Sequence, residues 1–407
     1  MAERLYTARQ AGADLARAGL LDGMLVERAG ALVPGDPGAA PGGFLGAGLD
    51  SRQLGPGALF VALQGERVDG RGFAPAVLMA GHWVLTAAHR GPGPDPLAGA
   101  AAAPRTGALL CTDPVAALQE LARCWRRSLT VPTVAVTGTN GKTTTKDLLA
   151  ALLQAAGPIH ATMGNLNNHL GVPVTLLGLR PEHRYAVVEM GASAVGEIAR
   201  LAPLADPAVG IITNASPAHL AGFRSLEDII LGKGELVAAL PPDGTAVLNA
   251  ASPGFAQWRL RSAAPVVSFG PGGDHPWSWR PAPDGSGLLE IDQSEWPVPL
   301  PGEHNGANLA AAILAGRALG VGDATLRRGL AGFTGSPHRG VRLDLAGRRV
   351  LDDAYNANPR SMVVAARALL ALPGPGRAVA VLGWMAELGP DSDAIHRQTG
   401  RELAAVG

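Results

Sequence analysis

The residues with the clearest chemical potential lie at positions 137–144, which read Thr-Gly-Thr-Asn-Gly-Lys-Thr-Thr. They stand between a run of β-branched residues and a segment with helical periodicity, which predicts a strand, a loop and a helix in that order. Glycines let backbone N–H groups face phosphate oxygens, and the N-terminus of the following helix adds a favourable dipole. A lysine in such a loop reaches the terminal phosphates, and the threonine after it can hold Mg²⁺. The sequence therefore predicts an ATP-type nucleotide site formed by Gly138, Thr139, Asn140, Gly141, Lys142, Thr143 and Thr144.

This loop is a shortened variant of the common phosphate-binding pattern, which would place a glycine where Val136 stands. The alternative interpretation is a glycine-rich turn before a helix, without a ligand. We favour the nucleotide site because the strand, the loop, the Lys-Thr pair and the helix all occur in the expected order.

Two further polar residues follow predicted strands. Glu189 ends a strand at 185–189, and His219 comes shortly after a strand at 209–213. The carboxyl ends of parallel strands share one crevice, and Mg²⁺ prefers carboxylate and phosphate oxygens. A single histidine or strand-end glutamate is more often structural, but their common edge favours a metal site beside the triphosphate.

Lysine is rare in this chain. Of the 34 lysines and arginines, three are lysines, at Lys142, Lys146 and Lys233. An amine can act as a compact cation or a nucleophile where a guanidinium cannot. Lysine is therefore retained where its chemistry is needed, or the three are survivors of a coding bias; the composition alone leaves both open. Lys146, one turn into the predicted helix, has the position of a solvated surface charge.

The elements that position these residues alternate between strand and helix. Strands are predicted at 133–137, 185–189 and 209–213, and helices at about 142–156 and 194–202. This alternation is typical of a mainly parallel sheet with helices on both faces. The fold class is therefore α/β.

The rest of the chain divides around this core. Residues 245–300 read as extra strands appended to the same sheet, and a helix is expected from about 305 to 319. The final segment should contain strands 341–345, 349–352 and 378–382 and a helix at 359–372. In the first part, loops are expected at 32–46 and 91–104, strands at 58–63 and 83–86, and a helix at 114–126. We predict three domains, at 1–129, 130–333 and 334–407.

Composition limits the function. Lys+Arg and Asp+Glu are both 34, which gives no net field to attract nucleic acid, and no apolar run is long enough to span a membrane. Charged residues near the N-terminus argue against a signal peptide, so we expect a cytoplasmic protein without membrane insertion.

The motifs resemble those of the Mur ligase family over nearly the whole chain. The phosphate loop, the segments around Glu189 and His219, and residues 302–308 are similar to that family's motifs. The resemblance implies an N-terminal UDP-binding domain, a central ATP-binding domain and a C-terminal nucleotide-fold domain. It also implies that Asn305 approaches the adenine of ATP.

Three stretches resemble the member of this family that adds D-alanyl-D-alanine: residues 164–173, residues 352–359, and residues 381–383 with 385–389. The resemblance implies that ATP phosphorylates the terminal carboxylate of UDP-N-acetylmuramoyl-tripeptide in peptidoglycan precursor synthesis. The free amine of D-alanyl-D-alanine then attacks the acyl phosphate to form an amide. Two Mg²⁺ ions and a monomeric enzyme are expected.

Further site residues follow from the resemblance. Lys233 matches the lysine that is carbamylated in the family and helps to hold a second Mg²⁺. Arg342 and Asp353 match contacts to the phosphate and ribose of ADP, although a strand-surface charge and a turn former are alternative roles. The UDP-substrate residues implied are Ser51, Arg52, Asp69, Asn165, Asn168 and His169.

Three departures from the family keep alternatives open. Trp384 replaces the usual aspartate, Arg71 replaces the usual histidine, and the last domain is about half the expected nucleotide-fold unit. A truncated, inactive relative that binds nucleotide or UDP-peptide as a scaffold is one alternative. The diamino-acid-adding member of the family is another.

Overall fold

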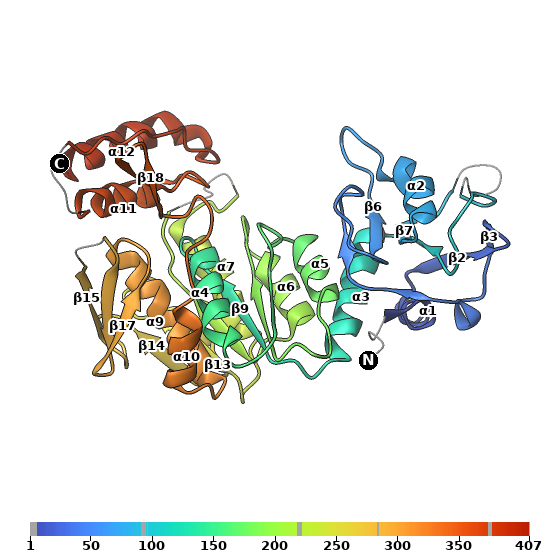
Figure 1. Cartoon of the computed structure of the whole chain (residues 1–407), viewed down its shortest axis with the longest axis horizontal. Coiled ribbons are helices and arrows are strands. Elements are labelled where there is room, and N and C mark those ends of the chain that lie inside the picture. The colour runs from blue at the N-terminus through green and yellow to red at the C-terminus, as the bar shows by residue number, and fades with distance from the viewer. Residues whose placement is uncertain are drawn as a thin grey trace. The chain divides into compact units, whose positions relative to one another are not determined.

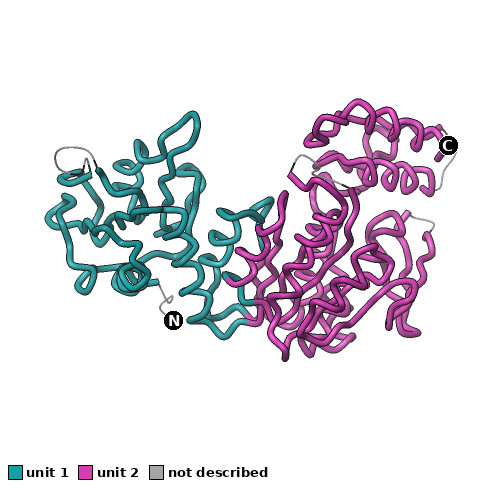
Figure 2. The backbone as a smooth tube through the Cα atoms, turned by 180° about the vertical axis from the view of Figure 1, so that it is seen from behind, with its two compact units in different colours: residues 1–131, 162–183, 204–206 teal, residues 132–161, 184–203, 207–407 magenta. Residues whose placement is uncertain are grey.

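The computed structural model describes residues 6–90, 95, 97–217, 222–282, 285–372 and 377–406. The chain forms two compact units (Figure 2). The first comprises residues 1–131, 162–183 and 204–206, and the second comprises 132–161, 184–203 and 207–407. The predicted α/β class is confirmed. Among the described helices, none is both long and apolar enough to cross a membrane.

The first unit is built on a six-stranded sheet in the order β3-β2-β8-β7-β6-β5. Strands β5 to β8 run parallel to one another, β2 runs antiparallel to β8, and β3 runs antiparallel to β2 at the edge of the sheet. The strands are β2 (Leu21–Arg28), β3 (Ala31–Pro34), β5 (Ala47–Gly48), β6 (Leu59–Ala62), β7 (Trp83–Ala87) and β8 (Gly107–Cys111), with a separate pair β1 (Tyr6–Thr7) and β4 (Gly43–Phe44). The helices are α1 (Ala8–Arg17), α2 (Ala74–Met79), α3 (Pro114–Arg127) and α5 (Gly171–Leu177).

The strands predicted at 58–63 and 83–86 and the helix at 114–126 are confirmed as β6, β7 and α3. The loop predicted at 32–46 is wrong at its start, because β3 forms a hairpin with β2. Ala29 and Gly30 both adopt positive φ, as a tight two-residue hairpin turn requires. Leu32 then packs in the core at 1% exposure, which the glycine- and proline-rich composition concealed.

The second unit is built on a fully parallel sheet in the order β10-β11-β9-β12-β13-β14. Its strands are β9 (Thr133–Thr137), β10 (Ile159–Ala161), β11 (Tyr185–Glu189), β12 (Val209–Ile212), β13 (Thr245–Asn249) and β14 (Val266–Phe269). The central strands are buried on both faces, as their near-continuous apolar sequences predict. The strand order runs outward in opposite directions on the two sides of β9, and ligands of open α/β sheets bind beyond the carboxyl ends of the strands at such a reversal.

Helices cover both faces of this sheet (Figure 1). Helices α4 (Lys142–Gln154), α9 (Glu303–Ala318) and α10 (Asp323–Leu330) pack together, while α7 (Leu226–Ala238) packs with α8 (Phe255–Arg261). The helices predicted at 142–156 and 305–319 are thus confirmed. The helix predicted at 194–202 is α6 (Glu197–Ala205), which begins later because Gly196 has a φ of 93° and lies outside the helical region.

Only part of region 245–300 joins the parallel sheet. Strands β13 and β14 do, but β15 (Trp277–Pro281), β16 (Gly287–Ile291) and β17 (Ser294–Val298) form a separate antiparallel sheet. The expectation that all these strands extend one sheet is therefore wrong. A tight turn at Asp292 and Gln293, both at positive φ, returns β17 directly against β16. Helix α9 contacts both sheets, so it is buried almost all round.

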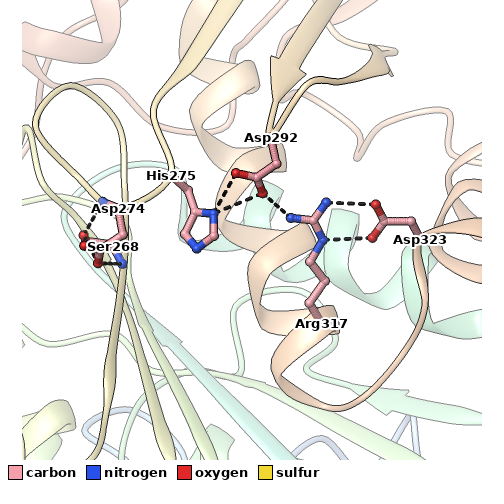
Figure 3. A network of polar contacts seen from close by, with 6 residues as sticks. All are labelled: Ser268, Asp274, His275, Asp292, Arg317 and Asp323. Atoms are coloured by element: carbon pink, nitrogen blue, oxygen red, sulfur yellow. Dashed lines mark hydrogen bonds and ion pairs between the residues drawn. The ribbon is translucent and has the colours of Figure 1, made fainter.

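A network of ionic contacts ties this hairpin to α9 and α10 (Figure 3). Arg317 of α9 donates to both carboxylate oxygens of Asp323 at 2.8 Å and to Asp292 at 2.5 Å. The imidazole of His275 pairs with the same Asp292 carboxylate at 2.9 Å. The Arg317 side chain is 25% exposed, so solvent screens this network only in part.

Replacement of Arg317 by alanine should lower the free energy of unfolding by about 1–2 kcal/mol, because it leaves Asp292 and Asp323 without their shared cation. Urea unfolding of the variant measures this loss. Arg280→Ala is the matched control, since the Arg280–Glu295 pair is 60% and 57% exposed and should change stability by less than about 0.5 kcal/mol. Equal losses in the two variants would contradict a stabilising role for the network.

The final segment is an α/β arrangement of its own. The predicted strands are confirmed as the hairpin β18 (Val341–Leu345) and β19 (Arg348–Asp352), and the predicted helix as α11 (Pro359–Leu370). Helix α12 (Ser392–Val406) packs beside α11 (Figure 1). The strand predicted at 378–382 is wrong, since residues 377–386 adopt neither helix nor strand. A strand needs a hydrogen-bonded neighbour, and β18 and β19 pair with one another in the described part of the chain.

Candidate active site

The phosphate loop connects β9 to α4 in a conformation that requires its two glycines. Gly138 and Gly141 have φ values of 140° and 80°. A Cβ atom on Gly138 would lie 2.0 Å from Oγ1 of Thr213, and one on Gly141 would lie 2.3 Å from Oδ1 of Asn308. The loop is therefore packed so closely against its neighbours that no side chain fits at either position.

The segment that follows β12 fixes this loop. Thr139 N–H donates to Asn214 O at 2.9 Å, and Asn140 N–H donates to Asn214 Oδ1 at 3.1 Å. The Thr213 hydroxyl donates to Asn140 O at 2.6 Å. The sequence predicted a functional role for His219 in this segment but not for Thr213 and Asn214. Their position directly after a central strand was a usable signal. The loop is thus preorganised by its neighbours rather than by its own sequence.

Lys142 lies at the start of α4 among other charges. Its ammonium donates to Thr139 O at 3.0 Å. Burial lowers the pKa of Lys142, the nearby Glu189 carboxylate opposes that shift, and Arg339 adds to it. Glu189 is 2% exposed and ends β11, where it pairs in register with Val136 of β9. The structure therefore brings Lys142 and Glu189 to one sheet edge, as the sequence predicted.

Lys233 reaches the same region from α7. It is 2% exposed, donates to Ala192 O at 3.1 Å and lies above the Phe223 ring. Burial, reinforced by repulsion from Lys142, lowers the pKa of Lys233 to about 7, while Glu197 and Glu235 act in the opposite direction. The Lys233 amine is therefore substantially neutral near pH 7. His219, the fourth residue predicted here, lies outside the described residues.

Thr143 and Thr144 open α4 behind the loop, and Thr143 is buried at 8% exposure. Lys146 is one turn further along. The sequence suggested a solvated surface charge there, which is wrong, because Lys146 is 4% exposed and pairs with Asp147 at 2.6 Å. The cause is the packing of α4 against both α9 and α10, which leaves little of the helix surface in water.

Asn305 is buried at the start of α9 and connects to α4 through a second asparagine. Its amide donates to Pro301 O at 2.8 Å and accepts from the Asn308 amide at 3.1 Å. Asn308 in turn accepts from the Thr145 hydroxyl at 3.3 Å. Asn308 belongs to the motif at residues 302–308, but the sequence predicted no role for it. The chain of amides links the predicted adenine residue to the helix that carries the phosphate loop.

The final segment contributes an arginine that the sequence did not predict, Arg339, whose charge acts on both Lys142 and Asp353. Desolvation raises the pKa of Asp353 to about 6, and Arg339 opposes that shift. Arg339 also lies 3.8 Å from the centroid of the Tyr355 ring. Arg342, by contrast, is exposed on β18 opposite Leu351. Arg339 is thus better placed than Arg342 to face a nucleotide phosphate.

Another residue of this segment touches the phosphate loop directly. The Asn358 amide donates to Asn140 Oδ1 at 2.6 Å and also caps α11. Trp384, which departs from the family pattern, is exposed and stacks on His396 at a centroid distance of 6.0 Å. Its ring therefore contributes a surface contact within the last segment.

The candidates for the UDP-linked substrate all lie in the first unit. Arg52 is exposed and pairs with Asp50 at 2.7 Å, next to Ser51. Asp69 accepts from the Arg71 N–H at 2.9 Å after β6. Both loops follow the carboxyl ends of parallel strands, as the substrate loops of α/β sheets do. Arg71, which replaces the usual histidine of the family, forms an ion pair with Asp95 at 2.6 Å that holds its loop in place.

Asn165, Asn168 and His169 lie in the segment before α5 of the same unit. The Asn168 side chain accepts from Leu170 N–H at 3.1 Å and from Gly171 N–H at 2.9 Å. The carbonyl of His169 accepts from Gln119 of α3 at 3.0 Å. These bonds order the segment, and His169 is exposed. The predicted site thus divides cleanly, with all UDP-side residues in the first unit and all ATP-side residues in the second.

Comparison with known families matches three regions of the chain. Residues 45–90 match the catalytic domain of the Mur ligase family, residues 136–316 the Mur ligase middle domain, and residues 338–406 the glutamate ligase domain of Mur ligases. The middle-domain match contains the phosphate loop, Glu189 and Lys233.

Individual relatives extend this match. The chain is 37% identical over 378 residues to UDP-N-acetylmuramoyl-tripeptide–D-alanyl-D-alanine ligase of Escherichia coli. The alignment covers 88% of this chain and 78% of that protein. Its fold is similar to a crystal structure of MurF from Acinetobacter baumannii, with a TM-score of 0.79, 34% identity and coverage of 88% and 78%. It is also similar to MurF ligase from Thermotoga maritima in complex with ADP, with a TM-score of 0.73, 30% identity and coverage of 88% and 81%.

Proposed function

The chain belongs to the Mur ligase family, and we propose that its second unit carries the ATP-dependent chemistry while its first unit carries the uridine-side contacts. It is an ATP-dependent ligase that adds D-alanyl-D-alanine to UDP-N-acetylmuramoyl-tripeptide in peptidoglycan precursor synthesis. The observation that carries this function is the 37% identity over 378 residues to a ligase of that specificity. Because ATP and UDP-linked precursors are cytoplasmic metabolites, we place the reaction in the cytoplasm, and we expect a monomer.

The reaction has two steps. The terminal carboxylate of the tripeptide attacks the γ-phosphorus of ATP, so that an acyl phosphate forms and ADP leaves. The neutral amine of D-alanyl-D-alanine then attacks the acyl carbon, and the tetrahedral intermediate loses phosphate and a proton to give the amide. Lys142 and the dipole of the N-terminus of α4 offset the charge that develops on the transferred phosphoryl group.

The residues at the sheet edge fit a magnesium site. Thr143 supplies a hydroxyl at the start of α4, and Glu189 supplies a buried carboxylate near Lys142. Hydroxyl, carboxylate and phosphate oxygens are the ligands that Mg²⁺ prefers, and His219 is the expected additional ligand. Bound Mg²⁺ would neutralise charge on the β- and γ-phosphates. We propose Thr143, Glu189, His219 and Lys233 as the residues that hold it.

Lys233 would contribute as a carbamate. A neutral amine adds to CO₂ and loses one proton, which gives N-linked carboxylate, and the buried Lys233 amine with a pKa of about 7 is suited to that addition. The product carries a negative charge and two oxygen ligands where an ammonium carries neither. Carbamylation would therefore turn a cation into a magnesium ligand at a place where Lys142 already supplies positive charge.

Lys233→Ala should lower kcat by about 100-fold, because it removes that ligand while the phosphate loop stays intact. Acetate or formate should restore part of the activity by entering the space left by the side chain. Lys233→Arg is the matched control, since it fills the space and cannot form a carbamate, so added carboxylate should not help it. Rescue of both variants, or of neither, would count against a carbamate at this position.

Asp353 and Arg339 complete the proposed nucleotide contacts, with the Asp353 carboxylate toward ribose and Asn305 toward adenine. Since the folded protein raises the pKa of Asp353 to about 6, the carboxylate is ionised above that pH and becomes protonated as pH falls through it. ADP affinity should therefore weaken by about fivefold between pH 7.5 and pH 5. Isothermal titration with ADP measures this change. Asp353→Asn should bind ADP weakly at both pH values, and an unchanged pH dependence in that variant would exclude Asp353 as its source.

The function is tested by exchange of the acceptor. ADP release should require both UDP-N-acetylmuramoyl-tripeptide and D-alanyl-D-alanine. Turnover with a diamino acid on the shorter UDP-muramoyl dipeptide, and none with D-alanyl-D-alanine, would move the chain to the diamino-acid-adding branch of the family. Nucleotide binding without ADP release under any acceptor would instead indicate a scaffold.

A further inference from the structure

Two side chains of helix α7 form hydrogen bonds to the segment that follows Glu189. Nζ of Lys233 donates to the carbonyl of Ala192 at 3.1 Å. Two residues further along α7, the half-buried Glu235 carboxylate accepts from Gly196 N–H at 2.5 Å and from Ala199 N–H at 2.9 Å. Lys233 and Glu235 therefore act on the same short stretch of chain from one helix.

The two bonds to Glu235 satisfy backbone groups that have no other helical partner. Gly196 precedes α6 with a φ of 93°, and the first N–H groups of a helix lack intrahelical acceptors. A carboxylate at this end also interacts favourably with the helix dipole. Glu235 thus anchors the start of α6 to α7 and fixes where residues 190–196 must end.

The remainder of this stretch is held as tightly. The Glu197 carboxylate turns back and accepts from Ser193 N–H at 2.7 Å. On the other side, a Cβ atom on Gly222 would lie 2.3 Å from Ser193 O, so the backbones are in direct contact there. Ala192 lies between this contact and Glu189. At the other end, Met190 N–H donates to Val136 O at 2.8 Å, so the Ala192 carbonyl is set by bonds on both sides.

The direction of the Ala192 carbonyl matters for Lys233. A lysine carbamate keeps one hydrogen on Nζ, and the bond from Nζ to Ala192 O would fix that hydrogen. With Nζ–H held toward the loop, the planar carbamate can only extend its two oxygens away from it. We propose that Glu235 is a positioning residue of this ligase, which holds residues 190–199 so that Ala192 orients the Lys233 carbamate. This inference rests on the carbamate of the proposed function.

Substitutions at Glu235 separate positioning from charge. Glu235→Ala removes both acceptors and should reduce carbamate occupancy and kcat by about 10-fold, with KM for ATP changed less than about threefold, because the phosphate-loop contacts are untouched. Glu235→Gln keeps one carbonyl acceptor of the right length and should recover at least half of the occupancy. Glu235→Asp keeps the charge with a shorter reach and should resemble the alanine variant. Glu227→Ala, an exposed glutamate of the same helix, is the matched control and should behave as wild type.

The test is carbon-13 NMR of the substrate-free protein under ¹³CO₂, together with hydrogen exchange of residues 190–199. The expected result is a carbamate signal in wild type and Glu227→Ala, a weak signal in Glu235→Ala and Glu235→Asp, and faster exchange in those two variants. A full signal with unchanged exchange in Glu235→Ala would overturn the role of Glu235 and leave the carbamate standing. A wild type without any signal would overturn the carbamate, and this inference with it, while ligase turnover would still report the proposed function separately. If Glu235→Ala does not fold, the Glu235→Gln and Glu235→Asp pair decides by the same readouts.

Discussion

Replacement of Lys142 by alanine should reduce kcat by about 10³- to 10⁴-fold, with little change in the folded structure. The ammonium stands at the start of α4 beside Glu189 and donates to a carbonyl of its own loop at 3.0 Å, a bond that a phosphate oxygen would replace. Its contribution is greatest when charge moves onto the transferred phosphoryl group, so the loss should appear in kcat more than in substrate binding.

Single-turnover formation of ADP with saturating substrates measures the Lys142 effect, and thermal unfolding checks that the variant is intact. Lys142→Arg should be nearly as slow, because a planar guanidinium does not reproduce the position of a compact ammonium. A loss smaller than about 10-fold in Lys142→Ala would mean that another cation serves the phosphates.

Arg339→Ala should reduce kcat/KM for ATP by about 10³-fold, the range typical of an arginine that faces a transferred phosphoryl group. Its charge acts on both Lys142 and Asp353, and its guanidinium is held over the Tyr355 ring. Without Arg339, the positive charge proposed to face the phosphates would come from Lys142 of the phosphate loop.

Arg342→Ala is the matched control for Arg339, since it removes the same charge three residues away on an exposed strand. It should retain activity within about threefold of wild type. Steady-state kinetics with varied ATP distinguishes the two variants. A large loss in Arg342→Ala with a small loss in Arg339→Ala would restore the assignment that the sequence first suggested.

The choice between these arginines shows where sequence reasoning ends. Both precede or open the same predicted strand, so their spacing is equally compatible with a phosphate contact. The difference arises in the turn before β18, where His338 adopts a φ of 61° and pairs with Asp352 at 2.7 Å. That turn places Arg339 toward Lys142 and leaves Arg342 on the outer face of a hairpin. Such a turn depends on contacts between residues far apart in the sequence.

The phosphate loop was predictable because its signal is local. Glycines, lysine and threonine occupy consecutive positions, and a buried strand and a helix flank them. The structure also brings Glu189 and Lys233 within electrostatic reach of Lys142, Glu189 because parallel strands bring their carboxyl ends to one edge. The hydrogen bonds of Thr213 and Asn214 to the phosphate loop were not predicted, since hydroxyl and amide residues after a strand have no distinctive pattern.

Burial and strand pairing were the properties that the sequence could not supply. Lys146 has the spacing of a surface residue, but α9 and α10 cover that face of α4. Residues 378–382 alternate like a strand, and Val379 and Val381 are 70% and 93% exposed because no neighbouring strand pairs with them in the part that the structure describes. Both errors came from treating an element's own pattern as sufficient when its partners decide the outcome.

The acyl phosphate at the centre of this mechanism can be detected by isotope transfer. UDP-N-acetylmuramoyl-tripeptide labelled with ¹⁸O in its terminal carboxylate is incubated with ATP and D-alanyl-D-alanine, and the released phosphate is analysed by mass. We predict one ¹⁸O atom in each phosphate, because the carboxylate oxygen that attacks ATP leaves with the phosphoryl group. Unlabelled phosphate formed at the same rate as the amide would contradict carboxylate activation at this site.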